Sequence, residues 1–280
     1  MRARLWSIGM VSVVLAGGVL ASGCLHRKPK VKGFEAVVVS QDVRLLEQSL
    51  GGAKARYAAS LLGPRDGATI DRAQWQVLYD GEEISHGTEA LNLSFDENGN
   101  APLTLVLPVP YATNAKALAA LDGKKKVKLT IEGSVHFKHG LLYDAHTAFK
   151  LVADVVPPRL PRVALPKVEG ARFSSGVSQV GLLLEVKNPN PFPIVLSEAP
   201  YSVGLAGQLG SDGVALAGQP VPANGSITYP VRAYLDPPSA DPDDWPRRTK
   251  VDYRLTGAVR GDLFDVRFEF HGTTKLRSGN

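Results

Sequence analysis

Cysteine, aromatic residues and excess charge are all scarce in this sequence. Cys24 is the only cysteine among 280 residues, so no disulfide can form within the chain. Aromatic residues make up 7% of the chain and provide no platform for stacking bases. The net charge of +5 is too small to indicate a polyanionic partner. We therefore expect no nucleic-acid binding.

Catalytic and metal-binding motifs are also missing. The sequence contains no Gly-x-Ser-x-Gly elbow, no phosphate-cradling loop and no dinucleotide fingerprint. Its histidines are expected on the surface, and His136 and His139 should face opposite sides of a strand. Asp241-Pro242-Asp243-Asp244 could offer oxygen ligands to calcium, but it lacks the spacing of a calcium loop and also suits a proline-rich connection. We predict a protein that is not an enzyme and has no cofactor or metal.

The first residues have the pattern of a secretory signal. Arg2 and Arg4 precede an uncharged stretch that ends in Leu20-Ala21-Ser22-Gly23-Cys24. Small residues directly before a cysteine resemble the lipobox of bacterial lipoproteins. The resemblance implies cleavage after residue 23 and lipid attachment to Cys24. The alternative is an uncut transmembrane anchor, because the apolar stretch approaches the ~20 residues that span a bilayer.

The segment 24–33 is a short basic tether between the predicted signal peptide (1–23) and the folded chain. It is either a solvated linker or a contact for anionic lipid head groups. The lipid on Cys24 makes a membrane the expected partner. In enterobacterial lipoproteins an aspartate after the cysteine commonly signals retention at the inner membrane. Leu25 stands there instead, which favours the outer membrane of the cell envelope.

The rest of the chain repeats itself weakly, in order and at nearly one spacing. Val127–Val135 resembles Val251–Val259, Leu107-Pro108-Val109 resembles Tyr229-Pro230-Val231, and Trp75-Gln76-Val77 resembles Tyr201-Ser202-Val203. We read two tandem domains, 34–156 and 166–278, joined by a proline-rich linker over 157–165.

Within each domain the hydrophobic period is two. Apolar residues alternate with polar ones over 127–137, 180–187 and 264–270, and turn signals such as Asp80-Gly81 and Asn224-Gly225 separate such runs. One short helix is expected over 113–121 with Thr113 or Asn114 as its N-cap, and a helical turn within 237–248. The predicted fold is all-β, with two tandem antiparallel sandwiches.

One motif carries family information. The apolar strand ending at Lys187 is followed by Asn188-Pro189-Asn190-Pro191-Phe192-Pro193, and this resembles the late embryogenesis abundant proteins of the water-stress and hypersensitive-response (WHy) type over about 168–276. The resemblance implies an immunoglobulin- or fibronectin-III-like sandwich, no catalysis and a role in desiccation or other stress. The first domain has Gly63-Pro64-Arg65-Asp66 at the equivalent place and looks like a diverged copy.

The residues of this motif have a structural interpretation of their own. Prolines cannot donate to a β ladder, the residues before them are held extended, and asparagine amides can satisfy backbone groups where the ladder stops. We therefore interpret the segment as a strand terminator, with a ligand site as the alternative.

Three functions follow from these patterns. The first is protection of the cell envelope against drying or related stress. The second is a binding or scaffold module that docks an envelope protein, a lipid or another apolar ligand. The third, a hydrolase, would require a polar cluster that the sequence does not show. The patterns do not predict an oligomeric state.

Overall fold

The computed structural model describes residues 36–63, 68–139, 143–174, 177–205, 208–215, 218–235 and 250–278. These residues form strands and one short helix. In chain order the elements are β1 (Val37–Leu46), β2 (Gly52–Leu62), β3 (Thr69–Tyr79), β4 (Glu82–Ser94), β5 (Asn100–Pro110), α1 (Ala115–Leu121), β6 (Val127–His139), β7 (Tyr143–Val155), β8 (Arg162–Ser174), β9 (Val177–Lys187), β10 (Ile194–Val195), β11 (Ala199–Leu205), β12 (Gln208–Ala215), β13 (Pro220–Val221), β14 (Ser226–Leu235), β15 (Lys250–Gly261) and β16 (Phe264–Ser278).

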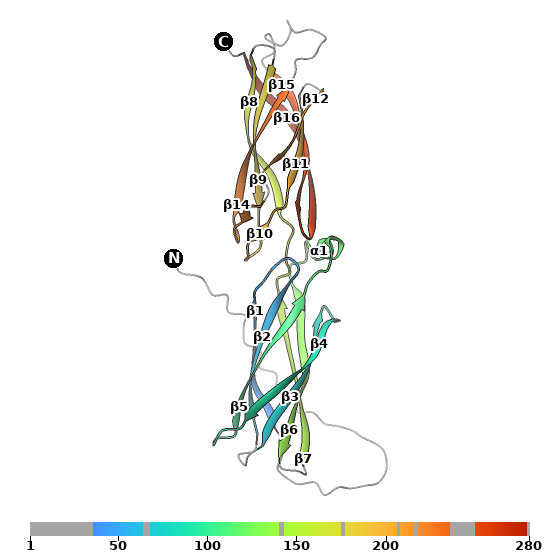
Figure 1. Cartoon of the computed structure of the whole chain (residues 1–280), viewed down its shortest axis with the longest axis vertical. Coiled ribbons are helices and arrows are strands. Elements are labelled where there is room, and N and C mark those ends of the chain that lie inside the picture. The colour runs from blue at the N-terminus through green and yellow to red at the C-terminus, as the bar shows by residue number, and fades with distance from the viewer. Residues whose placement is uncertain are drawn as a thin grey trace. The chain divides into compact units, whose positions relative to one another are not determined.

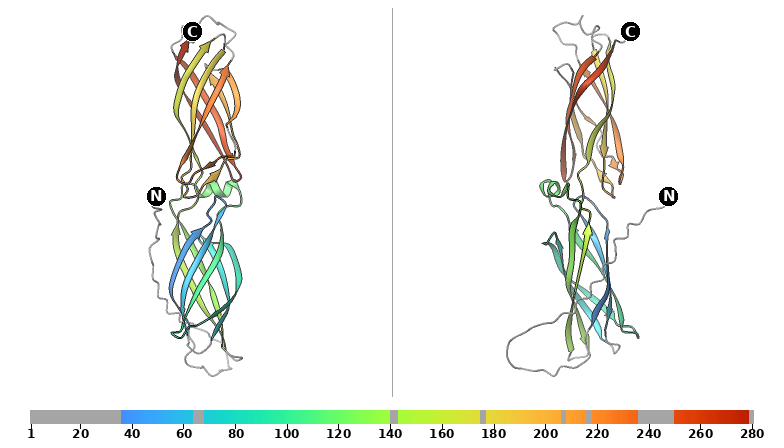
Figure 2. Two further views of the ribbon diagram at one scale, coloured as in Figure 1. Left: turned by 60° about the vertical axis from the view of Figure 1, so that its left-hand side comes forward. Right: turned by 180° about the vertical axis from the view of Figure 1, so that it is seen from behind.

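Contacts between Cα atoms divide the chain into two compact units. Of the described residues, unit 1 holds 36–48, 52–63, 68–110, 124–139 and 143–156, and unit 2 holds 49–51, 111–123 and those from Pro157 to Ser278. Each unit has its own strands (Figures 1 and 2).

Unit 1 is a sandwich of two antiparallel sheets. Their strand orders are β1-β2-β5 and β4-β3-β6-β7 (Figure 1). Asp80 and Gly81, with φ of 54° and 88°, form the tight turn between β3 and β4. Positive φ at two successive residues matches the right-handed twist of a hairpin, and aspartate and glycine tolerate it best.

The interior of unit 1 comes from the alternation that the sequence predicts. Leu103, Leu105 and Leu107 of β5 are each at most 1% exposed, while the residues between them face solvent. Tyr57 of β2 stacks on Phe149 of β7 with ring centroids 5.0 Å apart, so the two sheets meet face to face. This confirms the all-β sandwich class for the unit.

Unit 2 is built from a seven-stranded sheet and a two-stranded one. The order is β12-β11-β15-β16-β8-β9-β14 in the large sheet and β10-β13 in the small one. The parallel pairing of β16 with β8 covers only Leu276–Ser278 and Ala171–Phe173. This short pairing joins β8-β9-β14 to β12-β11-β15-β16. Leu184 of β9 and Leu255 of β15 belong to one hydrophobic core, so these two parts of the large sheet enclose a single interior.

The two units share one strand order. If the large sheet of unit 2 is divided at the short parallel pairing, its parts are β8-β9-β14 and β12-β11-β15-β16. These correspond in chain order to β1-β2-β5 and β4-β3-β6-β7 of unit 1. The repeated sequence segments lie on equivalent strands, namely β6 and β15, β5 and β14, and β3 and β11. The immunoglobulin- or fibronectin-like arrangement stays a prediction.

A row of glycines and aromatic residues crosses the four-stranded half of each unit. In unit 1 the row is Gly87, Trp75, Gly133 and Phe149, on β4, β3, β6 and β7. In unit 2 it is Gly213, Tyr201, Gly257 and Phe268, on β12, β11, β15 and β16. The rings lie where a glycine Cβ would be: a Cβ at position 87 would lie 2.6 Å from the Trp75 ring, and one at position 133 would lie 2.8 Å from the Phe149 ring. The glycines make room for the rings, which is a reason for glycine inside a strand.

Helix α1 has the N-cap that the sequence suggests. Asn114 Oδ1 accepts a hydrogen bond from the Ala117 amide at 2.9 Å, and Gly123 follows the helix with φ of 89°. Leu118 is fully buried in the core of unit 2, so residues 111–123 group with unit 2, although the sequence assigned them to the first domain.

Strand β8 begins at Arg162, within the predicted linker. Val163 and Leu165 pack against the core of unit 2, which explains why residues 162–165 form strand. The helical turn expected within 237–248 lies outside the described residues.

Candidate functional site

The candidate site is the Asn-Pro segment that follows β9. The strand ends at Lys187, and the Asn188 amide donates to the Gly225 carbonyl at 2.8 Å. Pro189, Pro191 and Pro193 offer no N–H to continue a ladder. The chain then turns inward, since Phe192 is 7% exposed and Ile194 only 3%.

The Asn188 side chain is buried at 2% exposure and makes the central contacts of the segment. Its Nδ2 donates to the carbonyl oxygens of Phe192 at 2.7 Å, Pro222 at 3.1 Å and Val221 at 3.3 Å. Its Oδ1 accepts from the backbone N and the Nδ2 of Asn190, at 3.0 and 2.9 Å. One amide thus joins the end of β9 to the loop after β13.

Asn190 extends this network to the segment before β8. Its side chain is also 2% exposed. Its Oδ1 accepts from the Arg159 amide at 2.7 Å, and its Nδ2 donates to the Arg159 carbonyl at 2.8 Å. Both side-chain amides of the motif are therefore bound within the fold itself, and both nitrogens donate to groups of the chain.

A groove of about 570 Å³ opens beside this network. Among the described residues that line it, Arg159, Arg162 and Lys187 are cations and Glu185 is the single carboxylate. Lys187 Nζ lies 3.2 Å from Glu185 Oε2, and Ser226 Oγ donates to Glu185 Oε1 at 2.8 Å. The Ser226 hydrogen bond and Lys187 lower the pKa of Glu185, so its carboxyl is ionised at neutral pH. Sequence reasoning missed this groove, because the distance in the chain between Arg159 and Lys187 hides their proximity.

A second polar cluster lies in unit 1, and it corrects one expectation. His136 is 2% exposed rather than a surface residue. A bulge in β3 presents Asp71 to it, so that the carboxylate contacts His136 Nδ1 and also binds Lys138 Nζ at 2.6 Å. The ring of His146, opposite on β7, lies 4.7 Å from that of His136 between centroids. A bulge cannot be read from alternation, which is why the burial of His136 was not predicted.

This cluster makes the stability of unit 1 depend on pH. Partial burial acts to raise the pKa of Asp71, but the hydrogen bonds and charges of Lys138 and His136 outweigh it and lower this pKa to about 2. The ionised carboxylate therefore stabilises the fold above about pH 4, and this contribution is lost as the pH falls toward 2.

We expect Asp71→Asn to lower the free energy of unfolding at pH 7 by about 1 to 2 kcal/mol, allowing for solvent screening. Chemical denaturation of variant and wild type from pH 7 to pH 2 should show the difference shrink at the acid end. Asp154→Asn, at an exposed ion pair with Lys126, is the matched control and should have little effect. A pH-independent difference for Asp71→Asn would contradict the assignment.

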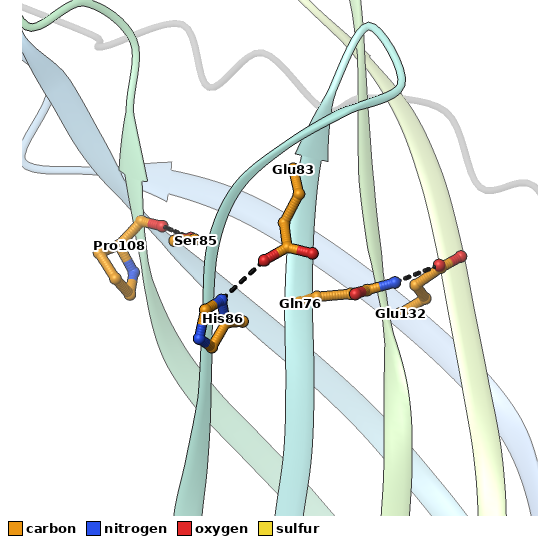
Figure 3. Close-up of polar contacts among 6 residues, drawn as sticks. All are labelled: Gln76, Glu83, Ser85, His86, Pro108 and Glu132. Carbon is orange, nitrogen blue, oxygen red and sulfur yellow. Dashed lines mark hydrogen bonds and ion pairs between the residues drawn. The ribbon is translucent and has the colours of Figure 1, made fainter.

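Other polar contacts of unit 1 lie between strands or within one strand. Figure 3 shows three separate pairs: Ser85 Oγ donates to the Pro108 carbonyl at 2.6 Å, Gln76 Nε2 donates to Glu132 Oε1 at 2.6 Å, and His86 Nδ1 lies 2.7 Å from Glu83 Oε1. The first pair links β4 to β5, which belong to different sheets. The His86 side chain is 77% exposed, as expected for a surface histidine.

Several predicted features fall outside the described residues. These are Cys24 with the signal and tether, Pro64-Arg65-Asp66, and the Asp241–Asp244 cluster. Across the described ranges, no three histidine, cysteine or acidic side chains gather as metal ligands would. In the same ranges, no helix has the length and apolar character needed to cross a membrane.

The sequence model of the late embryogenesis abundant protein family matches residues 183–273. The match starts within β9 and ends within β16, so it covers most of unit 2 and includes the Asn-Pro segment. This confirms the late embryogenesis abundant type of resemblance for that part of the chain. The WHy subtype stays a prediction.

Other comparisons contribute little. No curated protein matches the chain. Among solved structures, red sea bream transglutaminase is 12% identical with a TM-score of 0.29, and the match covers 85% of this chain but 31% of the enzyme. A protein from Archaeoglobus fulgidus is 14% identical with a TM-score of 0.26, covering 42% of this chain and 97% of that one. A β-glucuronidase from Bacteroides uniformis is 13% identical with a TM-score of 0.27, covering 80% of this chain and 26% of the enzyme. Scores this low support no conclusion about this chain.

Proposed function

We propose that this protein is a non-enzymatic lipoprotein of the cell envelope that protects against desiccation or related stress. The observation that carries the proposal is the family match over residues 183–273, which includes the Asn-Pro segment. The buried amide network supports it, because it gives that segment a role in folding.

The proposed anchor rests on the residues before the folded part. An uncharged stretch ending in small residues before Cys24 suits cleavage and lipid attachment, and Leu25 favours the outer membrane. Several acyl chains hold a protein far more firmly than one, since each buried CH₂ adds about 0.8 kcal/mol. A protein held in this way would act on the membrane surface or the space beside it.

We also infer that the two units arose by tandem duplication. The shared strand order, the repeated segments on equivalent strands and the glycine–aromatic row in both units support this. Unit 1, which has Gly63-Pro64-Arg65-Asp66 where unit 2 has the Asn-Pro segment, would then be the diverged copy.

The protective role predicts a survival defect. A strain lacking the gene should survive drying several-fold less well than its parent, and the wild-type gene should restore survival. A Cys24→Ser variant should fail to restore it, because the protein would no longer be held at the membrane. Mass spectrometry of the wild-type protein should show a mature chain that begins at an acylated Cys24.

These measurements separate the two parts of the proposal. Equal survival of deletion strain and parent at every severity of drying would refute the protective role. An unacylated Cys24, or an intact Met1, would refute the anchor and leave the protective role open to its own test.

A binding module of the envelope is the second candidate function. The groove beside the Asn-Pro segment favours it, because the cations there exceed the carboxylates.

A further inference from the structure

We propose that the groove formed by Arg159, Arg162 and Lys187 binds the phosphate group of an anionic ligand. This inference goes beyond the protective role and does not depend on it. The groove lies within unit 2, between the end of β9, the start of β14 and the segment that leads into β8.

The placement of two of these cations is unfavourable without an anion. Arg162 of β8 and Lys187 of β9 are directly opposite in the antiparallel register. Like charges at such positions destabilise a sheet. Lys187 has Glu185 as a partner, but Arg162 has no acidic partner among the described residues. A bound anion between them would remove the repulsion.

Arg159 provides the second observation. Its Nε is buried and has no hydrogen-bond partner in the described part of the chain. A buried donor without a partner is costly, so an acceptor from outside the chain would be favoured there. The backbone of Arg159 is fixed on both sides by Asn190, at 2.7 and 2.8 Å. The Asn-Pro segment therefore positions the arginine that faces the groove.

The charges of the groove fit a phosphate monoester best. Three cations and the ionised Glu185 leave a net charge of +2. A phosphate monoester carries about −1.5 to −2 at pH 7 and three terminal oxygens, whereas a carboxylate carries one charge and two oxygens. Arginine side chains are suited to paired hydrogen bonds with phosphate oxygens. Such a group could come from a soluble phosphate compound or from the head group of a lipid.

The test uses the mature chain from residue 24, with Cys24→Ser so that vesicles are not bound through the anchor. Calorimetry with inorganic phosphate tests the soluble source. Co-sedimentation with phosphatidylcholine vesicles, with and without phosphatidic acid, tests the lipid source. The variant Arg159→Gln/Arg162→Gln removes two groove charges. The control Arg56→Gln/Arg232→Gln removes two exposed charges elsewhere and changes the net charge equally.

We expect the groove variant to bind the phosphate probe at least tenfold more weakly than wild type and the control variant to bind like wild type. Glu185→Gln should bind several-fold more tightly, because it removes the only carboxylate among the described groove residues and frees Lys187. Thermal unfolding of each variant shows whether it is folded. Binding in one arm identifies the source of the phosphate.

Two results would overturn the proposal. One is the absence of saturable binding of either probe to the wild-type chain. The other is equal weakening in the groove and control variants, which would show attraction by net charge alone. If the double arginine variant fails to fold, the Glu185→Gln variant still tests the site. An affinity of Glu185→Gln equal to that of the wild type would also count against the proposal.

Discussion

Replacing Asn188 with alanine should lower the free energy of unfolding of unit 2 by about 3 kcal/mol or more. The side chain is 2% exposed, and its Nδ2 donates to three backbone carbonyls. The substitution leaves those oxygens, and the Asn190 amide, buried without this partner. Loss of a buried partner costs more than the net value of the hydrogen bond, because water cannot replace it.

Two further variants test whether the lost hydrogen bonds of Asn188 cause the destabilisation. Asn188→Asp keeps the size of the side chain but removes the donor and adds a charge, so it should destabilise unit 2 at least as much. Asn98→Ala removes an exposed asparagine side chain from the turn between β4 and β5 and should change stability by less than about 0.5 kcal/mol.

Urea denaturation measures the free energy of unfolding of each variant. Because the two units need not unfold together, hydrogen exchange shows which unfolding transition belongs to unit 2. The amides of β9 and β14 should lose protection first. If Asn188→Ala unfolds like the wild type, the amide network does not stabilise the end of the strand.

The second large effect is expected at the glycines under the aromatic rings. Gly133→Ala should destabilise unit 1, and Gly257→Ala should destabilise unit 2, each by about 3 kcal/mol or more. A Cβ at position 133 would meet the Gln74 carbonyl oxygen and lie 2.8 Å from the Phe149 ring. At position 257 it would meet the Pro200 carbonyl and lie 2.5 Å from the Phe268 ring. Relief requires the neighbouring strand to move, which weakens its ladder.

Gly181→Ala is the matched control, since this glycine also lies within a strand. There the added Cβ would lie 2.8 Å from the end of the Glu169 side chain, which is flexible and can move away. Denaturation with hydrogen exchange again distinguishes the units. If Gly133→Ala and Gly257→Ala each lower the free energy of unfolding by less than about 1 kcal/mol, the rings shift easily and the row is not closely packed.

The sequence predicted what depends on local pattern. Alternation over 180–187 placed Val180, Leu182, Leu184 and Val186 inside, and each is at most 1% exposed. The period of two and the turn residues were sufficient for the sandwich class, because each strand carries its own inward face. The N-cap of α1 was also local, since Asn114 and Ala117 are three residues apart.

What the sequence could not predict depends on contacts between distant segments. The burial of His136 follows from a bulge that brings Asp71 opposite it, 65 residues away in the chain. Arg159 lies in a segment that reads as a linker, and only the fold brings it to Asn190 and to the groove. The glycine–aromatic row did leave a signal, because Gly133 and Gly257 fall at the same place in the repeated segments.

The proline-rich segment 157–161, which precedes β8, should resist proteases. A protease must draw several residues of its substrate out into an extended strand within its active site. Pro157, Pro158 and Pro161 are buried, the Arg159 backbone is bound on both sides by Asn190, and the Leu160 amide donates to Asp122 Oδ1 at 3.2 Å. Drawing this segment out would break those bonds and expose the prolines. The stretch that resembles an open connector in the sequence is therefore a poor place to cut this protein.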